Sequence, residues 1–146
     1  MVGAPAMARV EGAAQRRLAV RLLSSALICG LGGMAAVRVG ANILATWVYN
    51  EPELAGMFIL SAPLTLLFAV QHAVNALLSG LGEQRQALMP ALAGSLLTLA
   101  LLHRWTALPG ARIAGAIRAM QLGQSATLLS TLGLLALALR QSKTPD

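Results

Sequence analysis

The sequence predicts an all-α integral membrane protein with four transmembrane helices. Apolar residues make up 57% of the chain and charged residues only 11%, whereas soluble domains carry about 25% charged residues. Mean hydropathy is +0.70 over the whole chain. Residues 57–82 contain no formal charge, and they can cross a bilayer core about 30 Å thick, which takes roughly 20 apolar helical residues.

Four apolar segments are separated by short polar connections, and they predict spans over residues 18–47, 57–82, 87–102 and 113–139. The third segment is short and needs His103 and Trp105 as anchors at the membrane surface. Short connections make neighbouring helices antiparallel, which predicts a four-helix bundle over residues 18–140. Outside it we expect a basic cytoplasmic segment, 1–17, and a cytoplasmic tail, 141–146.

Basic residues are divided unequally between the two ends of these spans. With the N-terminus inside the cell, the cytoplasmic side carries seven: Arg9, Arg16, Arg17, Arg21, Arg85, Arg140 and Lys143. The opposite side carries four: Arg38, Arg104, Arg112 and Arg118. Because cytoplasmic loops hold the excess of Lys and Arg, this division predicts that both termini are cytoplasmic. Since the basic residues flank apolar spans, we expect no nucleic-acid binding despite the net charge of +6.

Polar side chains follow the second half of the second span. Gln71, Asn75 and Ser79 recur every four residues with His72 beside them, so we expect them to share one helix face. They are our candidates for lining a hydrated substrate cavity. The alternative interpretation is that they form hydrogen bonds to neighbouring helices.

Two arginines, Arg38 and Arg118, are candidates for binding a lipid phosphate. Arg38 comes late in the first span, and Arg118 lies about two turns after Arg112 in the fourth. The planar guanidinium group suits phosphate because it donates two parallel hydrogen bonds. The alternative is that both side chains extend to the membrane surface as anchors.

Small residues recur every four positions along the fourth span. Gly115, Ala119, Gly123 and Thr127 belong to this series, which predicts a face where another helix approaches closely. Isolated histidines and the lack of any HExxH, GxSxG or GxxxxGK[ST] motif predict no catalytic residues, bound metal or cofactor, and so no enzyme.

The order of several segments resembles the C-terminal part of the polysaccharide-exporter and flippase superfamily. These segments are PAMARVEGAAQRR, NEPEL, LSAPLTLLFAVQHAVNALLSGLGEQR and ALPGARIAGAIRAMQLGQ, within about residues 4–140. The stage V sporulation protein B-like branch is the most similar. Its pattern of two glutamines followed by GLG and a basic loop is matched by Gln71, His72 and residues 80–82, and its Pro, Gly and small-residue run by Pro109, Gly110 and Gly115.

The resemblance implies the last four helices of an exporter with twelve or more, which moves a lipid-linked saccharide precursor across the plasma membrane for cell-envelope or spore-wall synthesis. The implied partners are membrane lipids, the lipid-linked saccharide, and further helices from a missing N-terminal part or a partner chain. Arg112 and Arg118 depart from the family, which has apolar residues near the start of its last helix.

Two other functions stay open. A small four-helix membrane adaptor would keep the packing faces without transport. A cation-coupled drug exporter would need an acidic residue inside a span, whereas Glu11, Glu51, Glu53 and Glu83 all fall in predicted loops.

Overall fold

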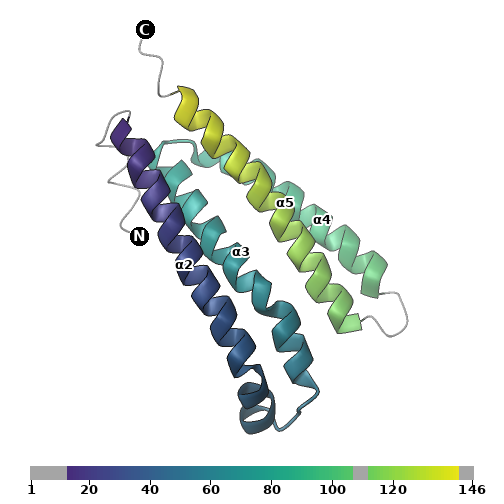
Figure 1. Cartoon of the computed structure of the whole chain (residues 1–146). Coiled ribbons are helices and arrows are strands. Elements are labelled where there is room, and N and C mark those ends of the chain that lie inside the picture. The colour runs from purple at the N-terminus through teal and green to yellow at the C-terminus, as the bar shows by residue number, and fades with distance from the viewer. Residues whose placement is uncertain (1–12, 107–111, 142–146) are drawn as a thin grey trace.

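Long α-helices form nearly all of the computed structural model, which describes residues 13–106 and 112–141 (Figure 1). The elements, in chain order, are α2 (Ala13–Ile43), a short π-helix η1 (Leu44–Val48), α3 (Leu54–Gly80), α4 (Gln84–Thr106) and α5 (Arg112–Gln141). Of the two predicted terminal segments, only residues 13–17 and 141 are described, and they belong to α2 and α5. Arg9, Glu11, Pro109, Gly110 and Lys143 lie outside the described residues.

Four helical stretches are long and apolar enough to cross a membrane: Ala14–Val48, Leu54–Gly80, Arg85–Trp105 and Ile113–Arg140. This confirms the predicted all-helical, multi-pass membrane architecture. The third helix is longer than the predicted span 87–102, and the first begins five residues before residue 18. Gln and Arg at these ends are good helix formers, so each helix continues beyond its apolar stretch.

The helices form an open row in the order α2, α3, α5, α4, and not the closed four-helix bundle that the short connections suggested. Helix α3 packs against both α2 and α5, α4 packs mainly against α5, and α3 scarcely touches α4. Figure 1 shows two antiparallel hairpins, α2–α3 and α4–α5, which lie closer together near the start of α2 and the end of α5 than at the opposite end. A row is tolerated because lipid covers apolar helix faces without a penalty.

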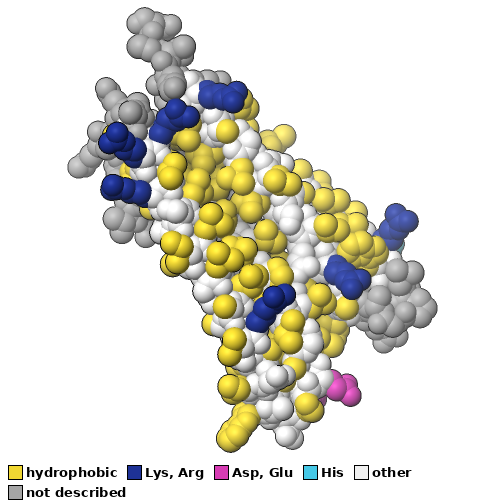
Figure 2. Space-filling model, in the orientation of Figure 1, with side chains coloured by type: hydrophobic (Ala, Val, Ile, Leu, Met, Phe, Trp, Pro, Cys, Tyr) yellow, Lys and Arg dark blue, Asp and Glu magenta, His cyan; other side chains and the backbone are white. Residues whose placement is uncertain are grey.

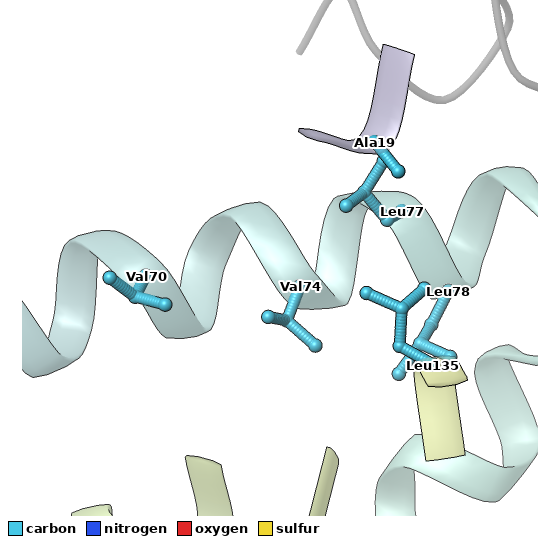
Figure 3. Packing of buried hydrophobic residues seen from close by; sticks show 6 residues of the cluster. All are labelled: Ala19, Val70, Val74, Leu77, Leu78 and Leu135. Atoms are coloured by element: carbon cyan, nitrogen blue, oxygen red, sulfur yellow. The ribbon is translucent and has the colours of Figure 1, made fainter. Parts of the chain in front are cut away.

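A small apolar core joins the hairpins at their closer end. It consists of Ala19 on α2, Leu135 on α5 and four residues of α3, namely Val70, Val74, Leu77 and Leu78 (Figure 3). The residues from α3 recur every three or four positions, so they form one stripe along this central helix. The chain then leaves α3 through Gly82, whose φ of +82° is a conformation that glycine adopts without strain.

Large apolar side chains cover the outer surface of the row (Figure 2). Val39 and Trp47 are 79% and 87% exposed, and Met89 on α4 is 71% exposed. A soluble monomer rarely exposes so much contiguous apolar surface. These faces are therefore suited to contact with lipid or with further apolar helices.

Gly30 sets the close approach of α2 to α3. A Cβ atom at this position would lie 2.8 Å from Leu66 Cδ1, 3.1 Å from Leu66 Cα and 3.2 Å from Ala69 Cβ. A Cβ atom at Gly32, on the same helix, would meet nothing within 4 Å. The contact between α2 and α3 therefore leaves no room for a side chain at Gly30, whereas Gly32 has room for one.

We expect Gly30→Leu to destabilise the protein by about 1–3 kcal/mol, because the added side chain forces α2 and α3 apart. Unfolding of the purified protein in detergent micelles, followed by circular dichroism, measures the change. Gly32→Leu is the matched control and should stay within about 0.5 kcal/mol of the unsubstituted protein. Equal losses in the two variants would contradict this packing of α2 on α3.

Candidate functional site

A pocket of about 180 Å³ lies between α3, α4 and α5. Its lining residues are Gln71, Asn75, Ala91, Gly94, Ser95, Thr98, Gly123, Gln124 and Thr127. Most of these side chains are polar and none is charged. The volume is sufficient for several water molecules, so the pocket is a place where uncharged hydrogen-bonding groups gather inside an otherwise apolar row of helices.

The pocket lies near the middle of the predicted membrane span. Gln71 is nine residues from Gly80, where α3 ends, which is about 14 Å at 1.5 Å per residue. Half of a bilayer core is about 15 Å. Water and lipid head groups are therefore distant, and each polar group at this depth needs a partner in the protein or in an enclosed cavity.

Gln71 has such partners. Its side chain is only 7% exposed, and Nε2 donates to Asn75 Oδ1 at 3.0 Å and to Thr131 Oγ1 at 3.1 Å. Thr131 is fully buried on α5, and its hydroxyl donates to the Thr127 carbonyl at 2.9 Å. This network joins α3 to α5 and offsets the cost of burying the amide.

The remaining hydroxyl groups in the pocket donate within their own helices. Ser95 donates to the Ala91 carbonyl at 2.8 Å and Thr98 to the Gly94 carbonyl at 2.8 Å. Thr127 donates to the Gly123 carbonyl at 2.9 Å. A hydroxyl oxygen that has donated its proton can still accept hydrogen bonds. The pocket thus offers acceptors to a ligand that carries its own donors.

Helices α4 and α5 cross closely at one side of this pocket through a reciprocal Gly and Thr arrangement. A Cβ atom at Gly94 would collide with Thr127 Oγ1, and one at Gly123 would collide with Thr98 Oγ1. Each threonine also donates to the glycine carbonyl four residues before it in its own helix. Gly-xxx-Thr therefore occurs on both partners, which allows the two backbones to approach as small-xxx-small helix pairs do.

The sequence candidates on the second span separate in the structure. Gln71 is buried in the pocket and Asn75 is exposed at its rim. His72 and Ser79 are exposed and do not line the pocket. The single face expected for all four is not observed, because successive residues of a helix point about 100° apart and His72 turns away from Gln71.

The small residues predicted to form a packing face on the fourth span are buried, whereas the two candidate arginines are exposed. Gly115, Ala119, Gly123 and Thr127 are all buried; a Cβ atom at Gly115 would lie 3.2 Å from Trp105 Cβ, at the end of α4. Arg38 is exposed on α2, and Arg118 is exposed beside a second groove. The arginines do not meet each other in one site.

Several pocket residues lie outside the candidates drawn from the sequence: Ser95, Thr98 and Gln124. The four-residue spacing of Gly94 and Thr98, repeated in Gly123 and Thr127, is a sequence signal that indicates Thr98. Among the described residues, no cluster of three His, Cys, Asp or Glu side chains that could hold a metal ion is found.

No protein-family model matches the chain, and neither does any curated protein or solved structure. Nothing in these comparisons links the chain to the exporter superfamily.

We expect Gly94→Ala to destabilise the α4–α5 hairpin by about 1–3 kcal/mol, because the methyl group meets Thr127 and comes within 3.0 Å of the Gly123 carbonyl oxygen. Thermal unfolding in micelles measures this loss. Gly133→Ala, where a Cβ atom has nothing within 4 Å, should be neutral or stabilising, since alanine favours helix by up to about 1 kcal/mol.

Thr127→Ala in the Gly94→Ala background should recover part of the stability, because it removes the hydroxyl that the new methyl group meets. Equal stability of the two alanine variants at Gly94 and Gly133 would show that α4 and α5 do not cross at Gly94.

Proposed function

We propose that this protein is a membrane transport component, the C-terminal part or a subunit of a flippase for lipid-linked saccharide precursors of the cell envelope or spore wall. The observation that carries the proposal is the uncharged polar pocket near the middle of the span. Amide and hydroxyl groups at that depth suit the hydroxyl groups of a sugar, which both donate and accept hydrogen bonds. Polar residues inside a membrane commonly mark substrate pathways.

The open row supports the participation of further helices. Asn75 and Ser95 at the rim of the pocket are exposed, and α3 and α4 scarcely touch beside it. An open polar pocket facing lipid is unfavourable. We therefore propose that helices from an N-terminal part or a partner chain cover the pocket on this side.

A cation-coupled drug exporter is less well supported. Glu51 and Glu53 lie between η1 and α3, and Glu83 lies between α3 and α4. The pocket itself contains no carboxylate among its described lining residues. Coupling to a proton or sodium ion would call for such a group within a span.

The second candidate function is a membrane adaptor without transport. The closed crossing at Gly94 and Gly123 favours it, as does the internal hydrogen bonding of Gln71. In an adaptor the polar residues would only hold helices together, and the exposed apolar faces of α2 and α4 would bind partner helices.

A flipping assay distinguishes the two functions. The chain, together with the helices that co-purify with it from its membrane, is reconstituted in vesicles that contain a fluorescent polyprenyl-diphosphate saccharide, and an impermeant quencher reports movement of this lipid between leaflets. We expect movement above that of empty vesicles. Gln71→Leu and Asn75→Leu should each slow it about fivefold, as expected for a lost hydrogen bond worth about 1 kcal/mol.

His72→Leu is the matched control, since this exposed residue lies next to Gln71 in the chain but outside the pocket, and it should leave the rate unchanged. Two results together would favour the adaptor. No variant, and not the unsubstituted protein either, would move the lipid, and partner helices that co-purify with the unsubstituted protein would no longer co-purify with Gly94→Ala.

We also propose that the protein lies in the plasma membrane with both termini in the cytoplasm. The end of the row at the start of α2 and the end of α5 carries Arg16, Arg17, Arg21 and Arg140, and Figure 2 shows Lys and Arg side chains gathered there. Such an excess favours the cytoplasmic side.

Single cysteines in a Cys29→Ala background test this orientation. We expect a membrane-impermeant thiol reagent, applied to intact cells, to label a cysteine at Glu51 and not one at Arg85, because the two positions lie at opposite ends of the row. The reverse pattern would invert the proposed orientation.

A further inference from the structure

A second hollow lies between α3 and α5, on the side of α5 that faces away from the polar pocket. It is a groove of about 490 Å³, lined by Pro63, Leu66, Leu67, Trp105, Arg118, Gln121, Leu122 and Ser125. At 100° per residue, Arg118, Leu122 and Ser125 share one side of α5, whereas Gly123 and Thr127 lie on the other. The groove is therefore separate from the proposed substrate pocket.

The groove carries a positive charge at one end and is lined mainly by apolar side chains along the rest. Arg118 is exposed and lies six residues after Arg112, where α5 begins, which is about 9 Å along the helix. Trp105 lies beside it near the end of α4, and tryptophan favours the membrane–water interface. From this level Leu66, Leu67 and Leu122 continue the groove into the apolar part of the row.

Two features on either side fix the shape of the groove. Gln121 Nε2 donates to the Leu60 carbonyl of α3, one turn before Pro63, and proline leaves the helix short of one backbone donor near this point. On the other side, Gly115 allows the backbone of Trp105 to approach α5, since a Cβ atom there would lie 3.2 Å from the Trp105 carbonyl oxygen. The helices that border the groove are thus held in place by contacts within the protein.

We propose that this groove binds one anionic membrane phospholipid, with the Arg118 guanidinium on its phosphate and an acyl chain along Leu66, Leu67 and Leu122. Basic pockets between transmembrane helices bind anionic head groups, and the arginine fork donates two parallel hydrogen bonds to a phosphate. No Asp or Glu is among the described residues that line the groove. Other occupants fit the groove less well. A soluble phosphate would leave its apolar part, along Leu66, Leu67 and Leu122, unfilled. A second copy of the chain would have to bury the charge of Arg118.

Native mass spectrometry tests the lipid site, using the full chain released from nanodiscs of mixed phosphatidylglycerol and phosphatidylcholine. We expect one phosphatidylglycerol to remain bound in preference to phosphatidylcholine. Arg118→Gln should weaken retention of phosphatidylglycerol roughly tenfold or more, since a hydrogen bond to a charged group is lost. Arg118→Lys should retain an intermediate preference because it keeps the charge but not the fork.

Two matched controls separate the groove from general charge and folding effects. Arg38→Gln removes an exposed arginine of α2 that does not line the groove, and it should leave retention unchanged. Ser125→Trp fills the groove without altering Arg118 and should also release the lipid, whereas Ser130→Trp, at an exposed position of α5 outside the groove, should not.

Equal losses in Arg118→Gln and Arg38→Gln, or undiminished retention in Ser125→Trp, would overturn the proposal. Neither result bears on the flipping assay, because the groove and the polar pocket share no lining residue. A failed lipid site therefore leaves the proposed transport function standing, and a failed flipping assay leaves the lipid site standing.

Discussion

The joint between α3 and α5 is the contact on which the rest of the structure depends, because it is where the two hairpins meet. In lipid no hydrophobic force draws helices together, so polar partners and close packing must do so. Two glutamine amides cross the joint in opposite directions: Gln71 of α3 donates to Thr131 of α5, and Gln121 of α5 donates to the Leu60 carbonyl of α3. Each amide thereby finds a hydrogen-bond partner inside the protein that lipid would not supply. The joint is thus specified by hydrogen bonding near the middle of the span and by apolar packing around Leu77, Leu78 and Leu135 at one end.

The same joint shapes the hollows on its two sides. Helix α5 packs on α3 through one face and on α4 through another, so α3 and α4 flank it without packing closely on each other. The space that this leaves is lined by Ser95 and Thr98, whose protons are already donated within α4. On the other side, Pro63 and Trp105 border a groove that is mainly apolar. One hollow therefore suits uncharged polar groups and the other suits a lipid, although both are lined by residues of α3, α4 and α5.

Hydropathy and length were sufficient to predict the helices, because a membrane span is defined by its average composition. The series Gly115, Ala119, Gly123 and Thr127 also falls on a buried stretch of α5, since a four-residue period keeps small residues on one face. The order of the row could not be predicted, because the short connection between α3 and α4 favours packing of these two helices, whereas α3 packs on α5. The sequence also could not predict which of Gln71 and His72 is buried. Both are polar and adjacent in the chain, and the position of Thr131 on α5 decides which side chain faces the protein interior. The sequence does not single out Gly94, because a single glycine is common in a membrane helix and the close approach at Gly94 depends on Thr127 of the facing helix.

The difference between the two hollows indicates what each side of the row requires. The polar pocket is open where Asn75 and Ser95 are exposed, and lipid acyl chains cannot satisfy these groups. Its completion therefore needs water, a polar ligand or side chains from further helices. The groove beside Arg118 needs none of these, because a phospholipid supplies both a phosphate for the guanidinium and an acyl chain for the leucines. Further helices are thus expected to pack against the α3 and α4 side, whereas the opposite side of α5 can face the bilayer directly. The contact between α3 and α5 thus holds the row together, but it leaves the polar pocket on one face of the row, and that face is unsuited to lipid.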